Sequence, residues 1–307
     1  MGLKTNLAMM YQGFKHIFRN VLGINGGQST NYALLQTSHR LEKGLCVRNP
    51  RALWGYDKAR KLVSLIQKEK ANASPDELSI LIAEAVLASF IAEKENIPSE
   101  RDCLNKLKEL VSSVNLNLSM KNNYGGALEL HKKDILQDQS VENLFLTRHS
   151  VRDFSDTPVD EAKLSRAVEL ALRAPSACNR QASQIYVINA NDRIKAGGTN
   201  ECHADKYLII TGNMKAFALS ELNDWIVSSS VFAGYLSLSL HAEGIGSCIF
   251  RKDIIQRSKY NDMIKSICHI PDDEQIILEM AIGNYKDLFK VPVSCRRNPK
   301  DVLHYIS

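Results

Sequence analysis

The sequence predicts an α+β fold for the second half of the chain and an all-helical region before it. In residues 141–307, runs of β-branched and aromatic residues alternate with stretches of helical periodicity, which is typical of a mixed or antiparallel sheet flanked by helices. In residues 1–140, apolar residues recur mostly at helical spacing. We therefore divide the chain into a helical N-terminal region, 1–140, and a second domain, 141–307.

The composition indicates a globular, cytoplasmic protein. The 307 residues are 44% apolar and 24% charged, which suffices for one large domain or two ordinary ones. The net charge of +5 accompanies no nucleic-acid-binding motif, so we expect no nucleic-acid partner. Seven widely spaced cysteines without a CxxC pair predict reduced thiols, with neither a disulfide framework nor a metal site. We find no bilayer-spanning apolar run and no signal peptide.

Three strands and two helices are predicted in the second domain. Residues 184–189, 207–211 and 275–282 are β-branched or aromatic runs bounded by turn residues. Residues 160–174, before the first strand, and residues 222–243, between the second and third, have helical character.

The first half begins with a basic amphipathic helix at about residues 4–22. Its apolar residues recur at helical spacing, and no acidic residue precedes Glu42. Such a helix either makes weak contact with an anionic membrane surface or packs against the rest of the chain. Packing is the more common use of such a stripe, and both interpretations stay open.

Residues 28–140 are expected to be helical. Ser74 is a candidate N-cap, with Pro75 at the first helical position and Glu77 reaching back to the cap. We expect that helix to close at Pro98 and another to run from Glu100 to about Val114.

The segment His39–Leu45 concentrates a histidine, two cations and a carboxylate within a few residues. It is either a contact site that reaches the second domain or a helix end with a local ion-pair cluster and a C-terminal glycine cap.

Four short motifs in the second half carry groups suited to holding an anionic ligand. The first is Arg148-His149-Ser150-Val151-Arg152, whose guanidiniums and hydroxyl can bind phosphate. The second is the loop from Pro175 to Gln181, in which Ser176, Asn179 and Gln181 present donors and acceptors after a helix stop.

The other two motifs lie nearer the C-terminus. A predicted helix ends at a glycine, and Gly246 and Ser247 follow in a turn where the backbone can approach a ligand. Arg296 and Arg297 precede a proline close to the end of the chain.

In this order and spacing the four motifs resemble the nitroreductase family of FMN-dependent enzymes. The resemblance covers roughly residues 143–304, about half of the chain. It implies an intertwined homodimer with FMN at the subunit interface. It also implies that the tail 301–306, which alternates like an edge strand, adds to the partner's sheet.

The resemblance also assigns roles to individual residues. Arg148 and Ser150, with His149 between them, match positions that hold the FMN phosphate and ribityl chain. Arg152 matches the cation near flavin N1, where reduced flavin gathers negative charge. The segment that reaches the FMN of the other subunit is matched by the loop residues Pro175, Ser176, Asn179 and Gln181. The turn that offers backbone amides to the flavin is matched by Gly246 and Ser247. The tail that binds the phosphate is matched by Arg296 and Arg297.

The chain departs from the family pattern at two places. Ala182-Ser183 stands where many relatives have Pro-Trp, and Arg180 is a charged residue within the loop. Arg180 either meets an anionic substrate or is an ordinary surface residue. The segments 190–206 and 212–223 are short. We therefore expect residues 28–140 to help cover the active site.

The resemblance implies that the flavin performs the chemistry, with hydride arriving from NADH or NADPH. We assign no catalytic side chain and interpret Cys178 and Cys248 as packing residues. His203 and His241 are expected to be isolated and structural.

The function implied is an FMN-dependent NAD(P)H oxidoreductase that reduces a small-molecule nitro, quinone or related acceptor. One alternative is a dedicated biosynthetic reductase or dehydrogenase acting on one specific intermediate. The other is a non-catalytic flavin-binding protein.

Overall fold

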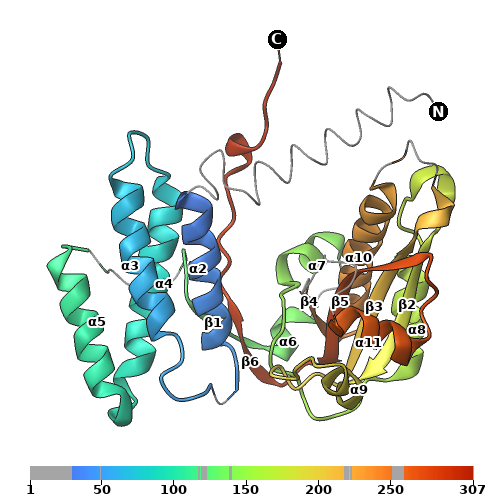
Figure 1. Ribbon diagram of the computed structural model, residues 1–307, viewed down its shortest axis with the longest axis horizontal. Helices are drawn as coiled ribbons and strands as arrows, with labels where there is room; N and C mark the ends of the chain where they lie inside the picture. Colours follow the sequence, from blue (N-terminus) through green and yellow to red (C-terminus); the bar gives the residue numbers. More distant parts are fainter. Residues whose placement is uncertain are drawn as a thin grey trace. The chain divides into compact units, whose positions relative to one another are not determined.

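The computed structural model describes residues 30–48, 50–116, 118, 123–137, 140–217, 221, 223–250 and 259–306 (Figure 1). The amphipathic helix predicted at about 4–22 lies outside these residues. The described residues form two compact units, 30–128 with 290–306, and 129–289.

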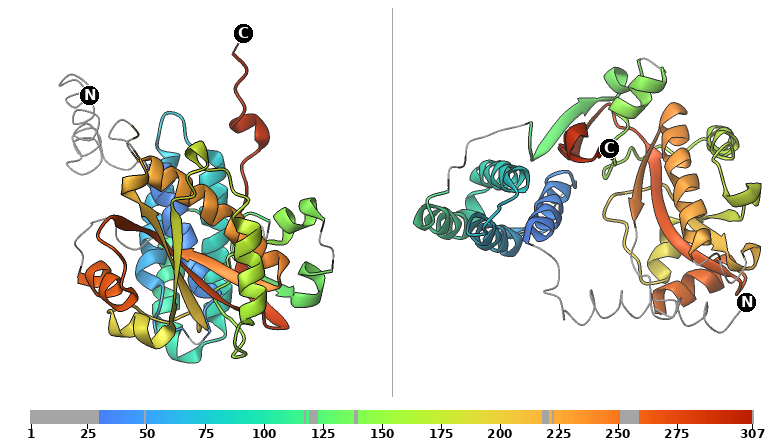
Figure 2. Two further views of the ribbon diagram at one scale, coloured as in Figure 1. Left: turned by 90° about the vertical axis from the view of Figure 1, so that its right-hand side faces the viewer. Right: turned by 90° about the horizontal axis from the view of Figure 1, so that it is seen from above.

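The first unit is a bundle of helices (Figure 2). It comprises α2 (Thr30–Leu45), α3 (Tyr56–Lys70), α4 (Glu77–Glu95), the short 3₁₀ turn η1 (Pro98–Glu100) and α5 (Arg101–Ser113). Helix α4 is apolar on most of its surface because α2, α3 and α5 all pack against it. Its largest fully buried side chain, Phe90, contacts the rings of Tyr56 and Trp54. The helical character predicted for this region is thus confirmed from residue 30 to residue 113.

The start of α4 differs from our prediction. Asp76, and not Ser74, is the N-cap, because its carboxylate accepts a hydrogen bond from the Ser79 amide. The amide of Asp76 in turn donates to the buried Glu69 carboxylate at 3.0 Å. A partner from the preceding helix therefore selects the cap, and local spacing alone could not reveal it.

The His39–Leu45 segment forms the last turns of α2. Glu42 is only 2% exposed; its carboxylate accepts from the Gly126 amide at 3.3 Å and lies 3.1 Å from Nδ1 of His39. Gly44 lies within the helix and is no C-cap: a Cβ there would stand 1.7 Å from the Trp54 ring. These contacts all lie within the first unit.

Residues 127–131, which we expected to be helical, form the strand β1 (Ala127–His131). This strand pairs with β6 (Leu288–Pro292) in a two-stranded sheet. The preceding Gly126 adopts φ +112°, a conformation that favours glycine. Because this φ is not helical, a helix cannot continue through Gly126. A short helix, α6 (Lys132–Ile135), follows.

The second unit contains a four-stranded, wholly antiparallel sheet in the order β2-β3-β5-β4. Its strands are β2 (Ser183–Asn189), β3 (Lys206–Asn213), β4 (Ile245–Phe250) and β5 (Glu274–Asn284). Its helical segments are α7 (Val141–Thr147), α8 (Glu161–Ala171), η2 (Ala177–Asn179), α9 (Ala190–Lys195), η3 (Met214–Ala216), α10 (Asp224–Ala242) and α11 (Lys259–Cys268). The predicted α+β fold, with its helix-flanked antiparallel sheet and its helices before the sheet, is confirmed.

The two faces of this sheet are covered differently. Leu208, Ile210 and Met280 face α8 and α10 in an apolar core. On the opposite face, Glu279 lies 4% exposed and accepts from Nε of Arg193 on α9 at 2.9 Å. The Arg193 guanidinium also stacks on the ring of Tyr207, 4.4 Å from its centroid. A buried ion pair therefore fastens α9 to the sheet.

The C-terminal segment follows β6 within the first unit. It includes the 3₁₀ turn η4 (Pro299–Asp301), and residues 303–306 form no strand within the described chain. Tyr305 and Ile306 are 91% and 93% exposed, so their apolar surface finds no cover among the residues that the structure describes. Pairing of this tail with a partner's sheet stays a prediction.

No helix in the described part of the chain is both long and apolar enough to traverse a lipid bilayer.

Replacing Glu279 with Gln should lower the free energy of unfolding by about 3 kcal/mol, because it leaves a buried guanidinium without its counter-charge. Glu169→Gln is the matched control, since it removes the exposed Arg166–Glu169 pair and should leave the free energy of unfolding nearly unchanged. Urea denaturation of both variants measures the difference. Equal effects would contradict the structural importance of the buried pair.

Candidate functional site

The first and third motifs meet at the edge of the sheet. Helix α7 ends at Thr147, and the chain then runs beside β4, where Ser150 forms a parallel bridge with Ser247. The amide of Val151 donates to the carbonyl of Ser247 at 3.0 Å. Residues separated by nearly 100 positions are thus brought together by backbone hydrogen bonds.

Arg152 is the most unusual residue of this edge. Its side chain is 8% exposed, and Nη1 donates to the carbonyl of Ser150 at 3.0 Å. Its Nε has no hydrogen-bond partner, and no carboxylate among the described residues pairs with it. A buried guanidinium without a counter-ion is costly, which makes Arg152 a candidate to meet an anionic ligand.

A chain of hydrogen bonds fixes the helix that leads into the first motif. The Thr147 hydroxyl donates to the Asn143 carbonyl at 2.7 Å and lies 2.9 Å from Nε2 of His241. The other ring nitrogen, Nδ1, lies 2.8 Å from the hydroxyl of Tyr285. Since the single Thr147 proton is already used, Nε2 must donate to Thr147 and Nδ1 must accept from Tyr285. His241 therefore holds α7 in place as a neutral ring.

The surroundings of His241 favour this neutral form. Burial lowers the pKa of His241 to about 4, and the charged Arg148 guanidinium and the neighbouring His149 ring act in the same direction. Burial also raises the pKa of Tyr285, which keeps its hydroxyl protonated as a donor. Our expectation that His241 is isolated was wrong, because it connects α10, α7 and the end of β5.

Gly246 makes room for aromatic packing. A Cβ on Gly246 would lie 3.1 Å from the ring of Phe154, and one on its partner Gly283 would lie 2.6 Å from Cβ of Phe154. The paired glycines thus let Phe154, which is fully buried, pack on the strand ends. Ligand approach at Gly246 stays a prediction.

The second motif forms a compact loop with an unusual backbone. Cys178, Asn179 and Gln181 have φ of 51°, 54° and 48°, a left-handed conformation that non-glycine residues rarely adopt. The Ser176 hydroxyl accepts from the Gln181 amide at 3.1 Å. The side chains of Asn179 and Gln181 are exposed, as is Pro175.

The loop and the first motif lie at opposite ends of the sheet. Ser183, which follows the loop, pairs with Gly212, and Gly212 pairs with Gln275 on β5. Ser247 pairs with Ile282, seven residues further along the same strand. At about 3.3 Å per residue, the two places are about 23 Å apart along β5. The structure therefore does not bring these two motifs together within one chain.

The fourth motif lies in the first compact unit. Arg296 and Arg297 are both exposed. Nη1 of Arg296 donates to the Ser294 carbonyl at 2.7 Å, and Nη2 of Arg297 lies 3.5 Å from the Asp76 carboxylate. Their assignment to a phosphate stays a prediction.

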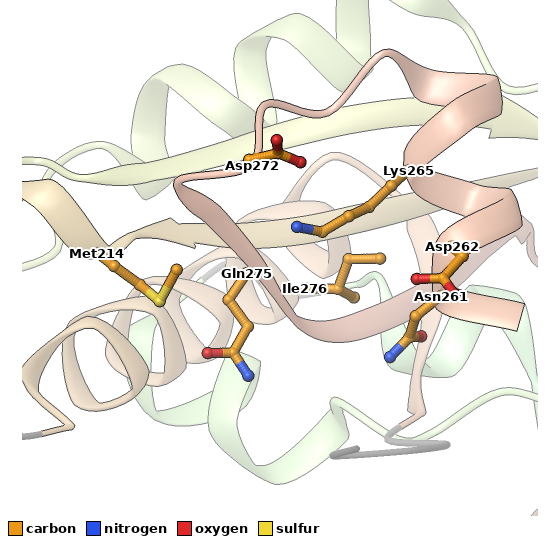
Figure 3. Close-up of a pocket in the computed structure, with 7 residues that line it drawn as sticks. All are labelled: Met214, Asn261, Asp262, Lys265, Asp272, Gln275 and Ile276. Atoms are coloured by element: carbon orange, nitrogen blue, oxygen red, sulfur yellow. The ribbon is translucent and has the colours of Figure 1, made fainter. Parts of the chain in front are cut away.

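A small pocket of about 280 Å³ lies elsewhere in the second unit (Figure 3). It is formed by η3, α11 and the start of β5, and it contains none of the residues of the four motifs. Its lining consists of Met214, Asn261, Asp262, Lys265, Asp272, Gln275 and Ile276.

Comparison with known proteins supports the resemblance seen in the motifs. Residues 146–209 match the model of the Nitroreductase family, which confirms the predicted resemblance for the segment that holds the first two motifs. A nitroreductase family protein of Clostridium difficile 630 is 19% identical, with a TM-score of 0.45 over 53% of this chain and 96% of that one. A nitroreductase-like family protein of Bacillus cereus is 16% identical, with a TM-score of 0.46 over 54% and 96%. An FMN-dependent nitroreductase of Clostridium difficile R20291 is 21% identical, with a TM-score of 0.42 over 53% and 98%.

The sequence did not reveal the contributions of Thr147, His241 and Tyr285. Each is a common residue in an ordinary setting, and only the tertiary structure joins them. The single available signal was Thr147 directly before Arg148, which is too common a pair to point to a network.

Protonation of His241 should destabilise the protein as the pH falls. The folded-state pKa is about 4 and the ordinary value is 6.5, so between these values the unfolded chain binds the proton and the folded chain does not. Stability that is present above pH 6.5 is therefore lost as the pH falls towards 4, by about 2 kcal/mol between pH 7 and pH 5. Urea denaturation at both pH values measures the loss.

His241→Gln is the control for this titration. Relative to the natural protein, it should be less stable at pH 7 and should lose about 2 kcal/mol less between pH 7 and pH 5. Parallel pH profiles for the two proteins would show that His241 does not carry the effect.

Proposed function

We propose that this protein is an FMN-dependent oxidoreductase of the nitroreductase type, active as a homodimer. It transfers hydride from NADH or NADPH to a small nitro, quinone or related acceptor. The match of residues 146–209 to the family supports the class of protein. The observation that most supports FMN as the cofactor is the buried Arg152 guanidinium, which has no anionic partner among the described residues.

The residues around Arg152 fit an FMN molecule. Reduced flavin gathers negative charge on one edge of its ring, and a fixed guanidinium there stabilises that charge. Arg148 and Ser150 lie on the same short segment and supply a cation and a hydroxyl for the phosphate and ribityl chain. His241 keeps this segment in place without adding charge at neutral pH.

FMN, when bound, would supply the hydride chemistry, and the protein would orient and stabilise it. Arg152 would hold charge at the ring edge, and the backbone of Gly246 and Ser247 would border the same end of the sheet. Arg296 and Arg297 are proposed to contact the phosphate.

The homodimer is supported by two observations on the second unit. One is the separation of the loop 175–181 from the first motif, which a second subunit would overcome by offering its own loop. The other is a stripe of exposed apolar residues on α10, at Val227, Val231 and Tyr235, with the exposed Gly234 beside it. Such a stripe on the outer face of a central helix is typical of a surface that another chain covers. Helix α7 adds the exposed side chains of Phe145 and Leu146.

The proposal is tested first on the purified full-length protein. It should carry or take up FMN, show the absorption spectrum of an oxidised flavin, and bleach anaerobically with NADH or NADPH. Protein that neither retains nor binds added FMN would refute the cofactor. Colour that neither nucleotide bleaches would refute the enzymatic role and support a flavin-binding protein.

Arg152→Gln should separate ligand binding from folding. Loss of a charged hydrogen bond to the flavin should weaken FMN binding by about 10- to 100-fold. The FMN-free protein should be as stable as before or more stable, because an uncompensated buried charge has been removed. Flavin fluorescence titration and urea denaturation measure the two quantities. Arg166→Gln on the exposed face of α8 is the control and should change neither. A large loss of apo-protein stability in Arg152→Gln would show a structural role instead.

Val231→Glu should dissociate the dimer and release FMN. A carboxylate in the centre of an apolar interface should weaken association by about 100-fold or more, because it is buried without a partner. Sedimentation and flavin titration measure the two effects. Ile194→Glu places the same charge on the exposed side chain of α9 and should leave both unchanged. A monomeric variant that binds FMN normally would contradict a shared site.

A further inference from the structure

We infer that the ion pair between Arg180 and Glu221 is a positioning device for the loop 175–181. In this role it holds Asn179 and Gln181 in the geometry that the flavin of the partner subunit requires. The inference rests on the proposed function, and it concerns two residues that neither the motifs nor the family match assign to the cofactor.

The loop needs an anchor because its own hydrogen bonds are local. The Asn179 amide donates to the Ser176 carbonyl at 3.0 Å, and the Arg180 amide donates to the Ala177 carbonyl at 3.1 Å. These bonds shape the loop but do not attach it to the rest of the unit. Three of its residues adopt left-handed backbone conformations although none is glycine. These conformations are strained, and a loop without an anchor would relax out of them.

Arg180 supplies the attachment. Its Nη1 donates to Glu221 at 2.8 Å and its Nη2 donates to the other carboxylate oxygen at 2.7 Å, across 41 residues of sequence. Both side chains are only 27% exposed, so the pair is shielded from much of the solvent. The guanidinium also lies 5.1 Å from the centroid of the Phe217 ring. A bidentate pair fixes the direction of the guanidinium as well as its distance.

Arg180 occupies the centre of the strained segment. Its own φ is −73°, between the left-handed Asn179 and Gln181. Its side chain is tied to Glu221, whereas the two flanking side chains are exposed. Arg180 is therefore turned into the unit, and its guanidinium is already satisfied by a carboxylate. This pairing favours a structural use of Arg180 over the binding of an anionic substrate.

The exposed pair has unused hydrogen-bonding capacity. Nε2 of Gln181 donates to Oδ1 of Asn179 at 3.2 Å. This leaves the side-chain Nδ2 of Asn179 and the side-chain Oε1 of Gln181 without partners among the described residues. A donor and an acceptor held side by side can pair with a ligand edge that carries one acceptor and one donor. This pairing requires that the loop keeps the two groups in place.

The test measures the loop and the cofactor separately. In the full-length dimer, Arg180→Gln and Glu221→Gln should each raise the hydrogen-exchange rate of the Gln181 amide by about tenfold, with or without FMN. The same variants should weaken FMN binding by about tenfold, because the freed loop must be ordered again when FMN binds. The exchanged pair Arg180→Glu with Glu221→Arg should recover most of both losses.

Control variants complete the design. Arg166→Gln with Glu169→Gln removes a pair of the same type from α8 and should alter neither readout. Arg180→Lys keeps the positive charge but loses the bidentate hydrogen bonding. Its exchange rate and FMN affinity should therefore lie between those of the natural protein and Arg180→Gln.

Two results would overturn the inference. One is an unchanged Gln181 exchange rate in both Arg180→Gln and Glu221→Gln. The other is weaker FMN binding in Arg180→Gln alone, which would make Arg180 a ligand-binding residue. If the natural protein fails to bind FMN, the proposed function fails, and the exchange rates alone still decide whether the pair anchors the loop.

Discussion

The pairing of β4 with β5 is the constraint on which the candidate site depends. Gly246 faces Gly283 in this pairing, and the absence of side chains there lets Phe154 pack against the strand ends. Phe154 in turn fixes the segment that begins at Arg148 beside β4. Ser150 and Val151 then bond to Ser247, and Arg152 is buried at the edge. A shift of β4 by one residue against β5 would turn the side chains of β4 to the other face and move Gly246 away from Gly283.

Charge is distributed unevenly over this unit. On the face covered by α9, the buried Arg193 has its carboxylate in Glu279, so its charge is compensated within the chain. At the edge of β4, the buried Arg152 has no such partner among the described residues. Nearby, His241 is held neutral by its hydrogen bonds and its burial. The two buried arginines thus differ in purpose, since one stabilises the fold and the other is suited to an anionic ligand.

The first three motifs, which share the second unit, do not form one site within a single chain. The first and third meet at one end of the sheet, the loop 175–181 lies at the other end, and Arg296 and Arg297 belong to the other compact unit. A shared site between two subunits is consistent with this arrangement and with the exposed apolar stripe on α10. Likewise, Arg180 anchors its loop within the chain while Asn179 and Gln181 face outward.

The sequence by itself determined the strands β2, β3 and β5, the helices α8 and α10, and the order of motifs that resembles the nitroreductase family. These features follow from local periodicity, turn residues and short spacing. Only the tertiary structure decided that Gly246-Ser247 lies in a strand, that Asp76 caps α4, that residues 127–131 pair with β6, and that His241 and Glu221 support the motifs. The cap at Asp76 depends on Glu69 in the preceding helix, and the other features depend on partners dozens of residues away. A local pattern holds no information about which group outside it will supply the hydrogen bond.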